Sequence, residues 1–310
     1  MKTTKIISAC AVLVALASCS NDQELSQQSA EDTPIRIQAN VGGIATRAAH
    51  NLLESSFSNG DAIKVFITEN TTANSGTSSG ASYSPTVYTH NGTSFAAVPP
   101  QYFPSNGNGI DVWAVYPSTV TKDAANFTIA SDQTDDVNYK NSDLMFATKL
   151  TDKKKNDDIN LSFSHNLSKI IVKLETEDGI NVDGVLNGAV IKLTNVVKKT
   201  ALSSVSGSGI TLGELSSDPS DKGVLTIGNY IPENGTAAIV IPQTTNTMQF
   251  KVTLANGGSY TAAMPNNTPK FETNKEYTYT LRLKANAITV SAEINPWSKE
   301  DKGTHDAILD

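Results

Sequence analysis

Near the N-terminus the chain runs Pro34-Ile35-Arg36-Ile37-Gln38-Ala39-Asn40-Val41, with an apolar side chain at every second position from Ile35 to Val41. A period of two predicts a β-strand with one face in a core and the other in water. The glycine pair at 42–43 ends this alternation. The sequence therefore predicts a half-buried strand whose core face consists of Ile35, Ile37, Ala39 and Val41.

The rest of the chain repeats this kind of pattern in short segments separated by glycine, asparagine and proline. The Asn91-Gly92 dipeptide predicts a hairpin within residues 83–98, and Asn256-Gly257-Gly258 predicts another between 248–254 and 260–264. About a dozen such strands indicate β-sandwiches, with residues 49–56 the best candidate for a short helix. Further strands are predicted at 63–67, 110–116, 127–130, 190–197, 223–227, 237–241, 277–283 and 287–294, and residues 143–150 are either a strand or a covered loop.

One segment changes its alternation midway. The apolar side chains of 161–167 occupy odd positions, whereas those of 170–174 occupy even positions. A change of parity within a continuous strand predicts a β-bulge, because one extra residue moves the following side chains to the other face.

The composition supports the same fold class. Thr, Ser and Asn together make up 92 of the 310 residues, while charged residues make up 18%. Threonine favours strands, and asparagine and serine favour turns, so a β-rich extracellular protein is favoured over a helical one. The net charge of -7 argues against nucleic-acid binding, which requires a basic face. We therefore expect no nucleic-acid partner.

The N-terminus carries processing signals. Residues 1–18 contain Lys2 and Lys5 followed by an apolar segment that is shorter than the roughly 20 residues needed to span a membrane. The segment Leu16-Ala17-Ser18-Cys19 resembles a bacterial lipobox, so we predict a cleaved lipoprotein signal peptide over 1–18 and a lipid on Cys19. An ordinary signal peptide with a chance cysteine is the alternative. Both cysteines of the chain lie in its first 19 residues.

No complete catalytic, metal or phosphate-binding motif is present, so we expect no enzyme activity, no metal and no cofactor. His165 is either a general base or a core histidine bonded to backbone, and the apolar face on which it lies favours the latter. Carboxylates around 175–183 are either a calcium site or a solvated turn. A sugar-binding platform is a further possibility for five aromatic residues, Tyr102, Phe103, Trp113, Tyr116 and Trp297, although Trp113 shares a face with Val115 and is favoured as core.

A possible cleavage site and a second alternating strand together indicate a way in which the chain could assemble. Arg47 follows the first strand among small residues, and a second alternating strand near the C-terminus presents Ile288, Val290, Ala292 and Ile294. A trypsin-like cut between Arg47 and Ala48 would detach the Ile35–Val41 strand and leave a groove with unpaired backbone groups. A matching strand from another copy could fill this groove, and head-to-tail repetition would build a filament.

With these features the sequence resembles the fimbrillin-like proteins of Bacteroidales pili over essentially its whole length. Each motif is weak alone, but their order is fairly specific. The resemblance rests on Cys19 in its lipobox, the strand before Ala45-Thr46-Arg47-Ala48, Asn59-Gly60-Asp61-Ala62-Ile63, Trp113-Ala114-Val115-Tyr116-Pro117, Asp143-Leu144-Met145-Phe146-Ala147, Leu161–Ile170, Ile241-Pro242-Gln243-Thr244 and Trp297.

The resemblance implies an all-β chain of two tandem transthyretin-like β-sandwich domains after a cleaved lipoprotein signal peptide. It also implies export to the cell outer membrane and surface, maturation by an arginine-specific protease, and assembly with other pilus subunits by donor-strand exchange into an adhesive fimbria. The charged run Lys153–Asp158 is the candidate domain boundary. The predicted regions are the signal peptide 1–18, a lipid-anchored propeptide 19–47, an N-terminal domain 48–155 and a C-terminal domain 156–310.

Several alternatives stay open. The donor strand is Ile288–Ile294, the end at Ala307–Leu309, or neither, and Arg36 is a second possible cut site. Without a cut, the chain would be a lipid-anchored surface adhesin, or a pilus anchor or tip protein, that binds glycan or a host ligand. A surface hydrolase of unrecognised type is the third reading.

Overall fold

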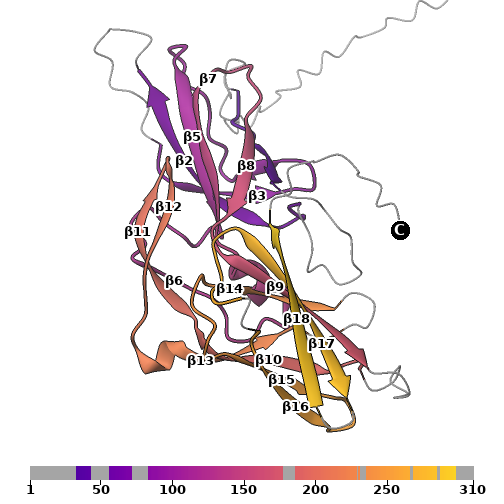
Figure 1. The fold of residues 1–310 in the computed structure, drawn as a ribbon. Helices are drawn as coiled ribbons and strands as arrows, with labels where there is room; N and C mark the ends of the chain where they lie inside the picture. Colours follow the sequence, from indigo (N-terminus) through magenta and orange to yellow (C-terminus); the bar gives the residue numbers. More distant parts are fainter. Residues whose placement is uncertain are drawn as a thin grey trace, which may run out of the picture. The chain divides into compact units, whose positions relative to one another are not determined.

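The computed structural model describes residues 33–42, 56–71, 83–176, 186–228, 230, 235–265, 268–284 and 287–297. Within these residues the regular structure is almost entirely strand, with one short α-helix and one 3-10 turn, η1 (Pro219–Asp221). The predicted all-β fold class is therefore confirmed (Figure 1). The division into two tandem transthyretin-like domains stays a prediction.

The largest sheet has seven strands in the order β1-β8-β7-β5-β2-β3-β4. Side chains of this sheet form a hydrophobic core, called here the first core cluster. It includes Ile35, Ile37 and Val41 of the predicted first strand, and Ala39 packs against it. The predicted hairpin at Asn91-Gly92 is present as β3 and β4, with Gly92 at a φ of 95°, which glycine adopts without strain. The strands are β1 (Gln38–Val41), β2 (Ala62–Asn70), β3 (Thr86–His90), β4 (Phe95–Ala97), β5 (Gly109–Tyr116), β7 (Met145–Lys153) and β8 (Asn160–His165).

Two four-stranded sheets enclose the second core cluster. One has the order β13-β10-β15-β16 and the other β14-β9-β17-β18, and side chains from both sheets meet in the cluster. The long antiparallel β17–β18 pair is drawn in yellow in Figure 1. The strands are β9 (Ser168–Thr176), β10 (Val190–Val197), β13 (Lys222–Ile227), β14 (Thr236–Val240), β15 (Gln249–Thr253), β16 (Ser259–Ala263), β17 (Lys275–Lys284) and β18 (Ala287–Pro296).

A three-stranded sheet, β12-β11-β6, contributes to the third core cluster. It consists of β6 (Asn126–Thr128), β11 (Lys199–Ser206) and β12 (Gly209–Leu215). Leu202 and Val205 of β11 join Phe66 and Trp113 of the seven-stranded sheet in this cluster. Strand β5 is therefore buried on both faces, which explains why Ile110–Tyr116 is nearly continuously apolar rather than alternating.

The predicted β-bulge near residue 166 is wrong. Strand β8 ends at His165 in the seven-stranded sheet, and β9 begins at Ser168 in a four-stranded sheet. The N–H of Asn166 donates to the carbonyl oxygen of Leu144 at this change of sheet. The apolar face changes parity because the chain leaves one core and enters another.

The helix α1 (Asp136–Asn141) is not among the elements predicted from the sequence. Asp135 caps it by accepting hydrogen bonds from the N–H groups of Val137 and Asn138. The predicted helix at 49–56 lies outside the described residues except for Ser56. The domain boundary predicted between 155 and 156 stays a prediction, although β8 lies beyond it and pairs with β7 and β1.

Candidate strand-exchange site

The segment 33–42 hydrogen-bonds to both edges of the seven-stranded sheet. On one side β1 pairs in parallel with β8, from Gln38 opposite Asn160 to Val41 opposite Phe163. On the other side the preceding residues bond to β4 and the loop that follows it. This one segment therefore closes the sheet, and without it both edges would present unpaired backbone groups.

The bonds to the β4 side are regular. The N–H of Ile37 donates to the carbonyl oxygen of Phe95 at 3.1 Å, and the N–H of Phe95 donates back to Ile37 at 2.7 Å. The N–H of Ile35 donates to the carbonyl oxygen of Gln101 at 2.7 Å. These distances are those of ordinary strong backbone hydrogen bonds.

The predicted apolar face of this segment lies in the first core cluster. Ile35, Ile37 and Val41 expose 2%, 0% and 8% of their surface, and Ala39 is half-buried. The ring of Phe57 packs edge-on against Phe95 and Phe163, with centroid distances of 5.0 and 5.1 Å, within the same cluster. Burying one isoleucine or valine side chain stabilises a fold by about 1.5–3 kcal/mol, so this segment is held by burial as well as by hydrogen bonds.

The candidate donor strand is β18, which lies at the edge of its sheet. It pairs with β17 in an antiparallel register from Lys284 opposite Ala287 to Lys275 opposite Pro296. No described strand pairs with its other side. Ile288, Val290 and Ala292 pack against the second core cluster, whereas Ile294 is 46% exposed.

The two candidate strands carry the same pattern of side-chain size. Ile35, Ile37, Ala39 and Val41 present large, large, small and large side chains at a spacing of two. Ile288, Val290, Ala292 and Ile294 repeat that order in the same chain direction. A strand that replaces another in a packed core must match its volumes position by position, because both voids and excess volume are destabilising.

His165 is buried, as predicted, but its predicted backbone partner is wrong. Its Nδ1 is hydrogen-bonded to Oδ1 of Asp143 at 2.9 Å. Its ring stacks on the indole of Trp297, with centroids 3.6 Å apart and planes 5° from parallel. The ring is therefore held by a carboxylate and an aromatic face, and sequence periodicity could not indicate either contact.

A small cavity lies beside this histidine. It is bounded by the end of β1 on one side and by α1 on another, since Val41 and Lys140 both line it. Lys140 forms an ion pair with Asp61 at 3.2 Å across the cavity lining. Burial raises the pKa of the Tyr116 hydroxyl above its ordinary value, as expected for an enclosed phenol. The lining residues are Val41, Ser56, Phe57, Asp61, Tyr116, Tyr139, Lys140, Asp143, Met145 and His165.

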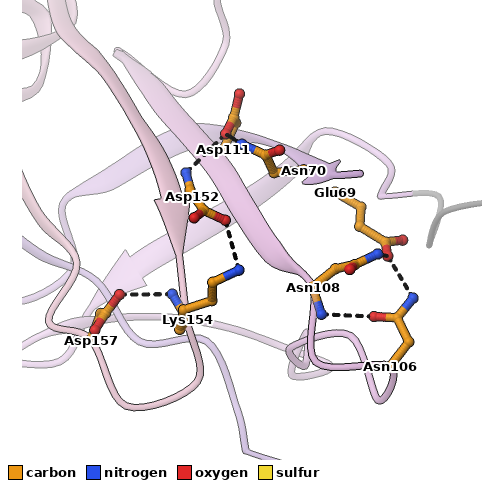
Figure 2. Close-up of polar contacts among 8 residues, drawn as sticks. All are labelled: Glu69, Asn70, Asn106, Asn108, Asp111, Asp152, Lys154 and Asp157. Carbon is orange, nitrogen blue, oxygen red and sulfur yellow. Dashed lines mark hydrogen bonds and ion pairs between the residues drawn. The ribbon is translucent and has the colours of Figure 1, made fainter. Parts of the chain in front are cut away.

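A separate polar cluster lies where β2 ends and β5 begins (Figure 2). The side-chain amides of Asn106 and Asn108 donate to Oε1 of Glu69 at 2.7 and 2.6 Å. These bonds join the turn before β5 to the end of β2.

Asp111 lies in the same cluster. It accepts hydrogen bonds from Asn70, from the N–H of Asp152 and from Lys149, each at 3.0 Å. Burial raises the pKa of the Asp111 carboxyl, but these donors together outweigh burial and hold the pKa below its ordinary value. Asp152 is itself paired with Lys154, with Oδ1 and Nζ 2.8 Å apart (Figure 2).

The aromatic residues considered as a sugar platform do not gather on one surface. Trp113 is 8% exposed and stacks on Phe66, with centroids 3.9 Å apart, in the third core cluster. Tyr116 is buried in the first cluster, and Trp297 packs against the third. The structure therefore places Trp113 in the core, as its shared face with Val115 predicted.

The remaining predicted site residues, Cys19, Arg47 and Ala48, lie outside the described residues. In the part of the chain that is described, no group of three or more His, Cys, Asp or Glu side chains is arranged to hold a metal ion. No helix among the described residues is long and apolar enough to cross a membrane.

Comparisons with known proteins agree with this fold. The family model for fimbrillin-like proteins matches residues 46–297. The chain is similar to the crystal structure of a candidate cell adhesion protein from Bacteroides uniformis ATCC 8492, with 21% identity, a TM-score of 0.62, and coverage of 85% of this chain and 98% of that one. A candidate cell adhesion protein from Bacteroides ovatus ATCC 8483 gives 20% identity, a TM-score of 0.61, and coverage of 87% and 99%. At these identities the structural likeness shows the fold alone. A comparison with curated proteins finds no match.

Proposed function

This chain belongs to the fimbrillin-like family, and from that premise we propose that it is a structural subunit of an adhesive pilus on the bacterial cell surface. Its partners on this proposal are other pilus subunits, joined head to tail. We assign it no enzymatic activity, metal or cofactor, because its proposed role needs only strand pairing and burial.

The proposal includes three maturation steps. The signal peptide 1–18 is removed, Cys19 receives lipid and anchors the chain to the outer membrane, and an arginine-specific protease cuts between Arg47 and Ala48. The cut removes both cysteines and the lipid anchor from the main chain. It also frees the segment 33–42 from its covalent connection to the rest of the fold.

The observation that carries the proposal is that residues 33–42 bond to both edges of the seven-stranded sheet. Their loss would open two strand edges and uncover an apolar groove in which Phe95 and Phe163 take part. Such a groove is costly in water and is filled most simply by another strand with the same pattern.

Strand β18 of a second copy fits this groove in one direction. If it runs parallel to β8, as β1 does, Ala292 takes the place of Ala39 and Val290 takes the place of Ile37. In the opposite direction Ala292 falls at the fully buried position of Ile37, and Val290 falls at the position of Ala39. The reverse insertion leaves a void at one site and overfills the other, so parallel insertion is favoured.

The alternative, an uncleaved lipid-anchored adhesin or an anchor or tip protein, differs in having no strand replacement. Limited trypsin digestion of residues 20–310 separates the two functions. The pilus-subunit proposal expects one major product that begins at Ala48, followed by oligomers in gel filtration. A ragged digest, or a stable monomer after the cut, would contradict it.

A further inference from the structure

The C-terminal end of β18 is fastened to the last residue of β8. Trp297, the residue directly after β18, stacks flat on His165 at the end of β8. The N–H of Trp297 also donates to the carbonyl oxygen of Asn274 at 3.1 Å, and the N–H of Asn274 donates to Leu167 at 2.9 Å. The candidate donor strand is therefore tied to the strand that pairs with the candidate displaced segment.

The histidine side of the stack is buried, whereas Trp297 is half-buried. His165 is 6% exposed, and its ring orientation is fixed by the hydrogen bond to Asp143. Hydrogen bonds of this kind are stronger where water is excluded, since water competes for the same donors and acceptors.

Val41 forms part of that enclosure. It lines the same cavity as His165 and Asp143, and it is the last residue of β1. If residues 33–47 leave, one wall of the cavity is lost and β8 becomes an edge strand. Water then reaches the His165–Asp143 pair from the side that Val41 had covered.

We propose that the stack of Trp297 on His165 is a latch that keeps β18 in its own sheet until the N-terminal segment has left. This inference rests on the proposed function, because it concerns how that strand exchange is regulated. The latch keeps the donor strand of an uncut subunit in place, and it releases the strand at the moment when a groove becomes available.

Hydrogen exchange of the uncut chain, residues 20–310, tests the latch directly. We expect Trp297→Ala to raise the exchange rates of β18 amides by about fivefold or more, the scale set by losing one aromatic stack. Ile294→Ala removes an exposed side chain from the same strand and is expected to leave these rates unchanged. Wild-type rates in Trp297→Ala would overturn the latch.

A second pair of variants tests the link to the N-terminal segment. Val41→Ala opens the cavity wall, and we expect it to raise β18 exchange. Ile35→Ala removes more buried volume from the same segment, residues 33–42, but Ile35 does not line the cavity. If Ile35→Ala raises the exchange rates of β18 as much as Val41→Ala does, the increase reflects a general loss of stability. The proposed link between Val41 and the latch is then overturned.

The cut protein gives a further test that is separate from the proposed function. In the monomer fraction from which mass spectrometry shows residues 20–47 to be absent, β18 exchange should rise to the level of uncut Trp297→Ala. If the β18 amides of this fraction stay protected from exchange, the latch is overturned. The cut after Arg47 would still be established by the same mass spectrometry. Failure of trypsin to cut after Arg47 would contradict the proposed function, while the uncut variants would still decide the latch.

Discussion

Ile37 and Phe95 donate backbone hydrogen bonds to each other, and through this pair the N-terminal segment joins the β4 side of the seven-stranded sheet. A few residues later the same segment pairs with β8 at the opposite edge. One short stretch of chain thus completes the sheet on both sides, and its stability contribution should be large for its length.

Replacing Ile37 measures that contribution. We expect Ile37→Ala to lower the free energy of unfolding of residues 20–310 by about 2–5 kcal/mol, because the side chain is fully buried. Urea denaturation measures the change. Val87 lies on β3 but is 39% exposed, so Val87→Ala is the matched control and should cost less than about 1 kcal/mol.

The proposed cut depends on Arg47 and not on Arg36. Arg36 lies between two hydrogen-bonded residues, Ile35 and Ile37, so the backbone there cannot enter a protease site without local unfolding. We predict that Arg47→Ala leaves the fold intact and abolishes both the Ala48 product and oligomers. Arg36→Ala should give the wild-type product, identified by N-terminal sequencing. An unchanged digest of Arg47→Ala would place the cut elsewhere.

Among the described strands β14 lies at the edge of its sheet, and the side chain of Gln133 bonds to its free side. This side chain accepts from the N–H of Ile239 at 2.7 Å and donates to the carbonyl oxygen of Ile239 at 2.9 Å, and it is 1% exposed. Gln133→Ala leaves both backbone groups buried without this partner, at about 1–3 kcal/mol for each. The exposed Gln249→Ala is the control in the same urea experiment and should be nearly neutral.

Asp111 should make stability depend on pH. Its lowered pKa means that the folded chain favours the ionised carboxylate, so the stabilisation is present above the ordinary carboxyl pKa and is lost as pH falls through the folded value. We expect Asp111→Asn to cost about 1–2 kcal/mol near neutral pH. Near pH 3 the difference from wild type should shrink. A difference that stays constant between these pH values would show that the charge of Asp111 is not responsible.

Much of the fold could be predicted from local patterns. Alternation identified the core face of Ile35–Val41, and the Asn91-Gly92 and Asn256-Gly257 turns located two hairpins that are present in the structure. These predictions succeed because the periodicity of a strand and the turn chemistry act over only a few residues.

The errors arose where long-range contacts decide the outcome. The change of parity after His165 predicts a bulge only if one strand continues through it, and a sequence does not reveal that β8 and β9 belong to different sheets. The partners of His165 lie 22 residues earlier, at Asp143, and beyond β18, at Trp297. Gln133 likewise bonds a strand 106 residues away, and no local pattern indicates such a partner.

On the donor-strand proposal, β18 of one subunit fills the place of residues 35–41 in the next subunit and runs parallel to β8. The cut chain contains no cysteine, so a disulfide between two engineered cysteines can be detected without interference from native thiols. In the parallel direction Glu293 takes the place of Asn40, which lies opposite Ser162, and all three side chains are exposed. In the reverse direction Thr289 would take that place.

A ladder of disulfide-linked oligomers on a non-reducing gel, run after the cut at Arg47, tests this arrangement. We predict that the double variant Glu293→Cys with Ser162→Cys forms a ladder of covalent oligomers, whereas Thr289→Cys with Ser162→Cys does not. A ladder from the Thr289 pair alone would show that β18 inserts antiparallel to β8. Oligomers that form without a ladder from either pair, or cut chains that stay monomeric, would contradict strand donation by β18.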